Sequence, residues 1–178
     1  MLEAFARIPP SQLNGWRLVI VGPAEAKHGG GGGDFLARLR RLAEPVEAHV
    51  GWNGPEFDPE RLAACYERAA IFVYPSLAEL GEASPLAPLE AMSAGCPALV
   101  SDLACFHDYI ADSVDGFVFD HRAARPAEAL AEKLVELMAD PSRLRAVGQR
   151  AQAKSAEFAV AKIASLYLDD FRSLSATP

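Results

Sequence analysis

Two glutamates, Glu82 and Glu90, lie eight positions apart in residues 74–102, a stretch with a proline-rich loop and a predicted helix. Carboxylate oxygens accept hydrogen bonds from the hydroxyl groups of a sugar or a ribose. The first backbone amides of a helix lack intrahelical partners and attract phosphate groups. The combination predicts a site for a ligand that carries both hydroxyls and a diphosphate, which in outline is a nucleotide sugar.

Both glutamates are expected at one edge of a sheet. Glu82 lies in the loop after a predicted strand at 71–74, where ligands of open α/β sheets bind. Pro88 fits the first position of a helix over 88–94, which would place Glu90 in the first turn, where the helix dipole favours a carboxylate. The alternative is purely structural: Glu90 stabilises its helix and Glu82 is solvated.

The elements around this segment alternate between strands and helices. Short apolar runs predict strands at residues 16–21, 46–50, 71–74, 98–101 and 116–119. Amphipathic segments predict helices at residues 34–43, 59–69, 88–94, 127–139, 142–151 and 157–173. Asp58 before Pro59 and Asp140 before Pro141 are typical helix starts. This order predicts an α/β fold with a doubly wound parallel sheet.

The last predicted helix, residues 157–173, carries apolar side chains on more than one face, and we expect it to pack widely or to cross to another domain. Residues 1–7 form a helical fragment where a parallel α/β domain normally opens with a strand. The five glycines at 29–33 lack the spacing of a dinucleotide fingerprint, and a following Lys-Ser/Thr is absent, so we interpret them as an exposed linker.

Composition excludes several classes of partner. The 178 residues suffice for one domain, and a net charge of −7 with a pI near 5.1 argues against nucleic acid. Three cysteines and four histidines show no metal-ligand spacing, so no metal site is predicted. No stretch is long and apolar enough to span a bilayer and no signal peptide is evident, so a cytoplasmic location is expected.

Longer motifs resemble the donor-binding domain of family 4 (group 1) glycosyltransferases, which have the GT-B architecture of two Rossmann-like domains. The matching residues are Pro75-Ser76, the run from Glu82 to Gly95 with its E-x7-E spacing, Pro97 to Asp102 and Asp115-Gly116-Phe117. The flanking LVIVG at 18–22 and the helix and strand of 59–76 follow in the family's order. The resemblance covers nearly the whole chain, residues 1–178.

The resemblance implies an enzyme that transfers a sugar from a nucleotide-diphosphate donor to an acceptor with retention of configuration. It implies no cofactor and no dedicated metal. Glu82 would be the catalytic-site carboxylate that holds hydroxyls of the transferred sugar, and Glu90 would accept hydrogen bonds from the ribose. The remaining donor-binding positions would be the amides around Ser84, Leu86 and Ala87 at the sugar and diphosphate, and Gly51 and Trp52 beside the base.

Two departures from the family pattern affect these expectations. Pro85 stands where the family has glycine, which removes an N–H donor and makes Glu79 an alternative carboxylate. The chain also begins at Met1 inside a helix that the family places after its first strand and a basic Arg/Lys segment. We therefore expect an N-terminally truncated, single donor-binding domain without the central strand and without the acceptor-binding domain. The loss would expose two strand edges, at 16–21 and 71–74, or force the sheet to close.

Three interpretations follow from this resemblance: a fragment of a glycosyltransferase that is inactive alone, a non-catalytic nucleotide-sugar-binding module, or one half of a split enzyme. Exposed strand edges further predict self-association. The motifs identify neither the base and sugar of the donor nor the acceptor.

Overall fold

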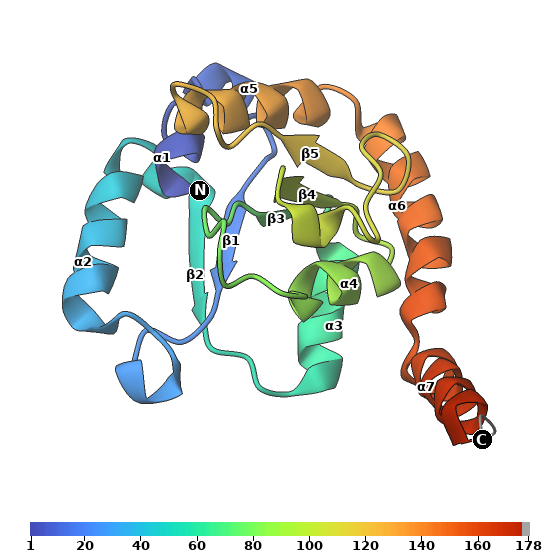
Figure 1. Cartoon of the computed structure of the whole chain (residues 1–178). Helices are drawn as coiled ribbons and strands as arrows, with labels where there is room; N and C mark the ends of the chain where they lie inside the picture. Colours follow the sequence, from blue (N-terminus) through green and yellow to red (C-terminus); the bar gives the residue numbers. More distant parts are fainter. Residues whose placement is uncertain (176–178) are drawn as a thin grey trace.

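The computed structural model describes residues 1–175 as parallel strands surrounded by helices (Figure 1). The strands are β1 (Leu18–Val21), β2 (Val50–Gly54), β3 (Phe72–Tyr74), β4 (Ala98–Ser101) and β5 (Phe117–Phe119). The α-helices are α1 (Leu2–Phe5), α2 (Gly32–Ala43), α3 (Pro59–Arg68), α4 (Leu86–Ser93), α5 (Pro126–Met138), α6 (Pro141–Ser155) and α7 (Val160–Ser175). All strand pairs are parallel, as expected when helices connect successive strands. The predicted α/β class is confirmed.

The strands form two separate sheets. β1 pairs with β2, and β3, β4 and β5 form a second sheet in that order. No backbone ladder joins β1 to β3, so each has one unpaired edge, and the side chain of Val19 in β1 is 51% exposed. Of the two outcomes expected for these strands, unpaired edges or a closed sheet, the structure shows unpaired edges.

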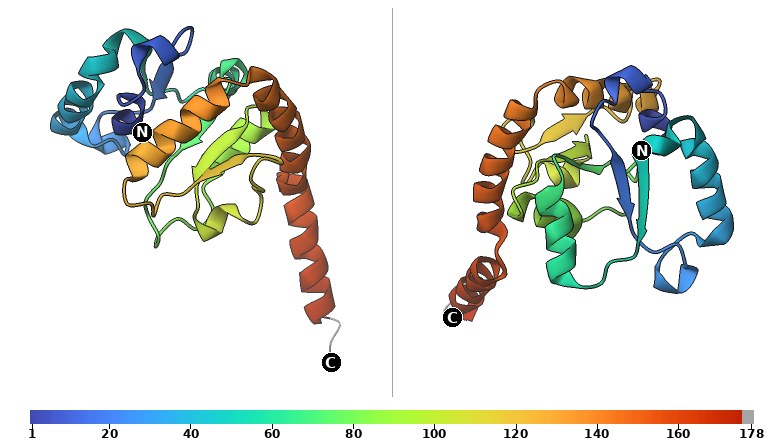
Figure 2. Two further views of the ribbon diagram at one scale, coloured as in Figure 1. Left: turned by 90° about the horizontal axis from the view of Figure 1, so that it is seen from above. Right: turned by 180° about the vertical axis from the view of Figure 1, so that it is seen from behind.

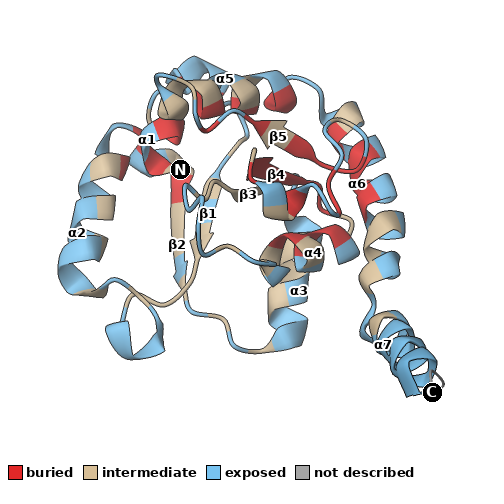
Figure 3. Ribbon diagram, viewed as in Figure 1, coloured by how far each residue is buried: buried red, intermediate tan, exposed pale blue. Residues whose placement is uncertain are grey.

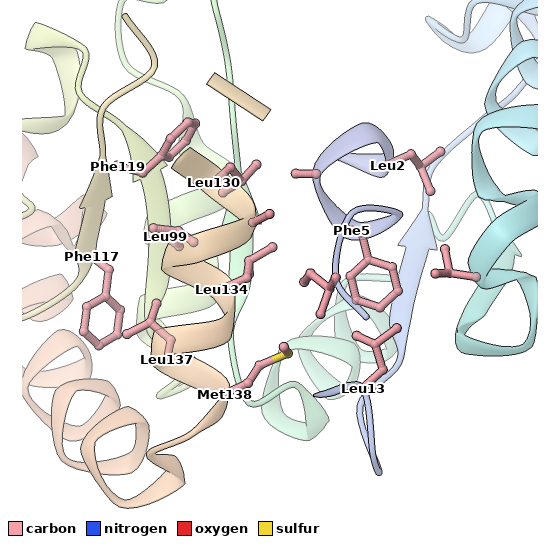
Figure 4. Packing of buried hydrophobic residues seen from close by; sticks show 14 of the residues in the cluster. Leu2, Phe5, Leu13, Leu99, Phe117, Phe119, Leu130, Leu134, Leu137 and Met138 are labelled. Atoms are coloured by element: carbon pink, nitrogen blue, oxygen red, sulfur yellow. The ribbon is translucent and has the colours of Figure 1, made fainter. Parts of the chain in front are cut away.

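Apolar packing around α1 and α5 connects the two sheets. Leu2 and Phe5 of α1 belong to the same buried cluster as Leu130, Leu134 and Met138 of α5, and Figure 4 shows Leu2 on the side of α1 away from α5. On its other side α5 packs against the three-stranded sheet, and a single core cluster contains buried side chains from both regions, among them Val50, Leu99, Phe117 and Phe119. Side chains rather than hydrogen-bonded strands therefore hold the two halves together.

The predicted helix starts at Asp58 and Asp140 are confirmed. Asp58 Oδ1 accepts hydrogen bonds from the amides of Glu60 and Arg61, at 2.9 and 3.2 Å. Asp140 Oδ1 accepts one from the amide of Arg143 at 3.0 Å. Each aspartate satisfies amides that have no partner within the helix, and each is followed by proline at the first helical position.

The strand predicted at residues 46–50 is misplaced. Residues Glu44–His49 form 3-10 turns that include Pro45, and β2 begins only at Val50. Proline lacks an N–H donor for a ladder and its fixed φ suits the start of a turn, which moves the strand toward the C-terminus. The glycine run is not wholly a linker either, because Gly32 and Gly33 form the start of α2.

Helix α7 extends away from the rest of the molecule (Figure 2). None of its residues is buried, as the pale blue of Figure 3 shows, and Leu166, Tyr167, Phe171 and Leu174 are each more than half exposed. Wide packing of this helix against the described chain is therefore excluded. Within residues 1–175 no helix combines the length and the apolarity needed to cross a lipid bilayer.

Candidate functional site

The candidate site lies at the carboxyl end of the three-stranded sheet. The loop of residues 75–85 leaves β3, carries Glu82 and leads into α4, which carries Glu90 (Figure 1). In a parallel sheet the loops after neighbouring strands meet at this edge. The segments after β4 and β5 therefore border the same region.

Glu82 is half-buried and is held by two hydroxyl groups. Ser76 Oγ donates to Glu82 Oε1 at 2.8 Å, and Tyr74 Oη donates to the same oxygen at 3.1 Å. The Tyr74 hydroxyl is 3.4 Å from Oε2, a weaker contact. Because both donors converge on Oε1, Oε2 keeps acceptor capacity for a ligand hydroxyl. Burial, and then the hydrogen bond to Glu82, raises the pKa of Tyr74 above its ordinary value.

Glu90 is exposed and is contacted by a tyrosine from α3. Tyr66 Oη donates to Glu90 Oε2 at 3.3 Å. Burial, followed by the charge of Glu90, raises the pKa of Tyr66 to about 12. Among the described residues no donor contacts Oε1 of Glu90, so this oxygen is available to a ligand.

Helix α4 begins two residues earlier than predicted. Leu86 is its first residue and Pro85 precedes it as the N-cap, so Pro88 occupies the third helical position rather than the first. Glu90 consequently lies in the second turn, where the helix dipole acts on it less strongly than predicted. Leu86 and Ala87 are the first two residues of α4, and their amides have no hydrogen-bond partner among residues 1–175.

The structure groups most of the predicted residues but not all of them. Glu82, Ser84, Leu86, Ala87 and Glu90 lie in one continuous segment at the sheet edge.

Gly51 and Trp52 belong instead to β2 in the other sheet, where Gly51 is opposite Val19. The indole of Trp52 lies under Arg40 of α2, with the guanidinium carbon 5.3 Å from the ring centroid.

Glu79, the alternative carboxylate, is already paired. It binds Arg122 through both oxygens and lies 2.8 Å from His121 Nε2. These contacts take about three of the four acceptor sites of the carboxylate and fix its orientation toward Arg122 and His121. Within the described chain there is no group of three or more histidine, cysteine or carboxylate residues that could hold a metal ion.

Sequence reasoning assigned no role to Tyr66, Tyr74 or Ser76, although all three contact the two glutamates. Tyr74 is the last residue of β3 and Ser76 follows it after Pro75, at the strand end where ligands of open α/β sheets bind. That position was a usable signal. Tyr66 gave none, because 24 residues separate it from Glu90.

Curated relatives align with most of the chain. An exopolysaccharide phosphotransferase of Streptomyces coelicolor is 32% identical over 176 residues, which are 97% of this chain and 17% of that protein. A D-inositol 3-phosphate glycosyltransferase of Nocardia farcinica is 32% identical over 149 residues, which are 80% of this chain and 31% of that protein. The chain thus spans less than a third of the length of either relative.

Solved structures share the fold. Sucrose-phosphate synthase from Thermosynechococcus elongatus matches with a TM-score of 0.77 and 23% identity, over 99% of this chain and 43% of that one. The Anabaena protein HepE in complex with UDP-glucose matches with a TM-score of 0.72 and 20% identity, over 97% of this chain and 44% of that one. These likenesses confirm the predicted Rossmann-like α/β fold.

The family itself is shown by sequence. Residues 1–154 match the family described as "Glycosyl transferases group 1", which extends over α1 to α6 and includes the whole candidate site. The chain therefore belongs to the group 1 glycosyltransferases.

Proposed function

We propose that this chain is the donor-binding part of a retaining glycosyltransferase that uses a nucleotide-diphosphate sugar. The observation that carries the proposal is the pairing of two anchored carboxylates with two free amides in one segment. Glu82 and Glu90 each receive a tyrosine hydrogen bond on one oxygen and keep acceptor capacity on the other. The amides of Leu86 and Ala87 lie between them in the sequence.

Each group matches one part of the donor. Glu90 accepts hydrogen bonds from the ribose hydroxyls, and Glu82 accepts them from hydroxyls of the transferred sugar. The free amides of α4 point their partial positive charge at the diphosphate and stabilise it as the sugar leaves. Gly51 and Trp52 border the base, and Ser84 lies beside the sugar. Binding of UDP-glucose by the structural relative HepE supports this class of ligand.

In this proposal the protein's own groups stabilise charge, and no cofactor takes part. Proline at position 85 provides no N–H, so the first amides that α4 offers to the diphosphate are those of Leu86 and Ala87. We expect the acceptor to be held by a domain other than the one formed by these residues, and we expect the chain to bind donor without transferring sugar.

Calorimetry against UDP-glucose and GDP-mannose, each compared with its free diphosphate, tests the proposal. Replacing Glu90 with glutamine removes a charged acceptor of ribose hydroxyls, so we expect affinity for both sugar nucleotide and free nucleotide to fall about tenfold or more. Glu128→Gln is the matched control, because Glu128 lies on α5 and its carboxylate pairs with Arg125. Equal nucleotide affinities of the wild type and Glu90→Gln would show that Glu90 has only a structural role.

A transfer assay distinguishes the proposal from a non-catalytic module. The same chain is assayed with and without a co-expressed acceptor-binding domain of a group 1 glycosyltransferase. Activity that needs both chains supports a donor-binding part. Donor binding with no activity in any combination would favour a non-catalytic module.

A further inference from the structure

Arg122 connects the segments that follow three neighbouring strands. It lies three residues after β5, and its Nε and Nη2 are each 2.8 Å from an oxygen of Glu79, in the loop after β3. Its Nη1 donates to the backbone oxygen of Asp102, directly after β4, at 2.8 Å. The Asp120 carboxylate fixes the backbone of Arg122 by accepting its amide hydrogen bond at 2.8 Å.

His121 adds a second, buried contact to the same carboxylate. Its side chain is 3% exposed, and Nε2 lies 2.8 Å from Glu79 Oε1. Because a carboxylate only accepts, Nε2 carries the proton in this pair. Hydrogen bonds from Arg122 first, and from His121 second, hold the pKa of Glu79 below its ordinary value. Glu79 is therefore an anchored anion at the sheet edge.

The loop that carries Glu82 depends on this anchor. Between Ser76 and Glu82, the residues other than Glu79 are Leu77, Ala78, Leu80 and Gly81, none of which has a polar side chain. Leu80 is 93% exposed, and Gly81 has a φ of +114°, a conformation that glycine adopts readily. Without Glu79, residues 77–81 have no side-chain hydrogen bond to the sheet. Gly81, whose backbone can adopt many conformations, directly precedes Glu82.

We propose that Arg122 and Glu79 are positioning residues that clamp the loop after β3, so that Glu82 stays beside the Tyr74 and Ser76 hydroxyls with one oxygen turned to the donor sugar. The inference rests on the proposed function and adds residues to it that touch no part of the ligand. It predicts that Arg122 and Glu79 affect recognition of the sugar through Glu82. Recognition of the nucleotide through Glu90 should not depend on them.

Three variants test the clamp: Arg122→Gln, Glu79→Gln and the double variant. Arg125→Gln is the control, because Arg125 is three residues away and makes an ion pair of similar length with Glu128, at 2.9 Å. Two measurements are made on each protein. Hydrogen exchange reports the mobility of residues 77–85, and calorimetry compares the sugar nucleotide that the wild type binds, UDP-glucose or GDP-mannose, with its free diphosphate.

We expect both single variants to speed exchange in residues 77–85 and to weaken sugar-nucleotide binding about tenfold, because a misplaced side chain loses its productive geometry. Binding of the free diphosphate stays as in the wild type. The double variant should show the same faster exchange and the same loss of sugar-nucleotide affinity as either single variant, because the two residues act as one unit. Melting temperature changes little, since exposed ion pairs contribute little to stability. If Arg122 and Glu79 only stabilised the fold, their replacement would lower the melting temperature. The ratio of the affinities for sugar nucleotide and free diphosphate would then equal that of the wild type.

The outcomes separate the clamp from the proposed function. Unchanged exchange in residues 77–85, or equal losses for sugar nucleotide and free diphosphate, overturns the clamp while donor binding by the wild type stands. A wild-type chain that binds no sugar nucleotide overturns the proposed function and the sugar-recognition role of the clamp with it.

Discussion

Each proposed ligand-binding glutamate receives a hydrogen bond from a tyrosine hydroxyl. Tyr66 comes from α3 and Tyr74 from the end of β3, so separate elements orient Glu90 and Glu82. A phenolate cannot donate, so each tyrosine must keep its proton for the contact to persist. Burial raises the pKa of both, and that of Tyr109, whose hydroxyl donates to the Pro85 carbonyl before α4.

We therefore expect three of the four tyrosines to ionise late when the folded protein is titrated with base. A tyrosine whose pKa is raised on folding stabilises the protein fully below pH 10, and that contribution from Tyr66 disappears as the pH rises through about 12. Ultraviolet absorbance of tyrosinate measures the titration, with the urea-unfolded chain as control. Identical curves for folded and unfolded protein would contradict the environments described for these residues.

The contacts of Arg122 show why some residues of the candidate site could not be predicted from the sequence. Its partner Glu79 is 43 residues away, and no local pattern links an arginine after one strand to a glutamate after another. Glu82 and Glu90 were predictable because their spacing belongs to one short segment with its own helix start. The residues that hold them come from other strands and helices, so only the folded topology brings them together.

At the scale of elements, helix packing at two glycines fixes how α6 crosses the end of α4. Gly148 of α6 lies against the backbone of Gly95, and a side-chain carbon at position 148 would overlap the Gly95 carbonyl oxygen and approach Pro97. Gly95 follows the C-cap of α4 and has a φ of +76°, a conformation that other residues rarely adopt. Gln152 adds a hydrogen bond to the Ser93 carbonyl at 3.1 Å. The orientation of the site helix therefore depends on α6.

Replacing Gly148 with alanine should lower the free energy of unfolding by about 1–3 kcal/mol, because the backbone it meets cannot move aside as a flexible side chain does. Thermal unfolding measures the change, and a decrease of several degrees in melting temperature corresponds to it. Gly33→Ala is the matched control, since a carbon there meets nothing within 4 Å and φ is not positive. A Gly148→Ala protein as stable as Gly33→Ala would contradict the close packing.

Element positions were predictable where a local chemical signal marks them. Asp58 and Asp140 start helices as predicted, because capping depends on a few neighbouring residues. The segment 46–50 has the alternation of a strand, yet Pro45 and the turns around it delay β2. Pro88 is compatible with any of the first helical positions, so proline alone could not decide where α4 begins.

At the scale of the whole molecule, the division into two sheets leaves the unpaired edges of β1 and β3 on the same chain. An unpaired strand edge presents a row of amide and carbonyl groups to any other strand. The exposed apolar side chains of α7 form a second surface that a copy of the chain could cover. The two surfaces predict different effects of mutation.

We expect the purified chain to self-associate through the strand edges in sedimentation velocity experiments. Val19→Lys places a charge on the exposed part of β1 and should shift the distribution toward monomer. Phe171→Lys, on the exposed surface of α7, is the matched variant and should leave the distribution unaltered. A monomer at all concentrations would contradict the prediction, and a response to Phe171→Lys alone would assign the association to α7.

The apolar contact between α1 and α5 also has a consequence for cooperativity. Residues 18–54 contain few buried side chains, and this half is joined to the rest by packing around two helices rather than by a shared ladder. Local opening free energies follow the density of buried contacts. We therefore expect two unequal unfolding units. The half with β1 and β2 should open at low cost while the fully buried β4 stays closed, and α4, which packs in the cluster around β4, should belong to the more stable unit.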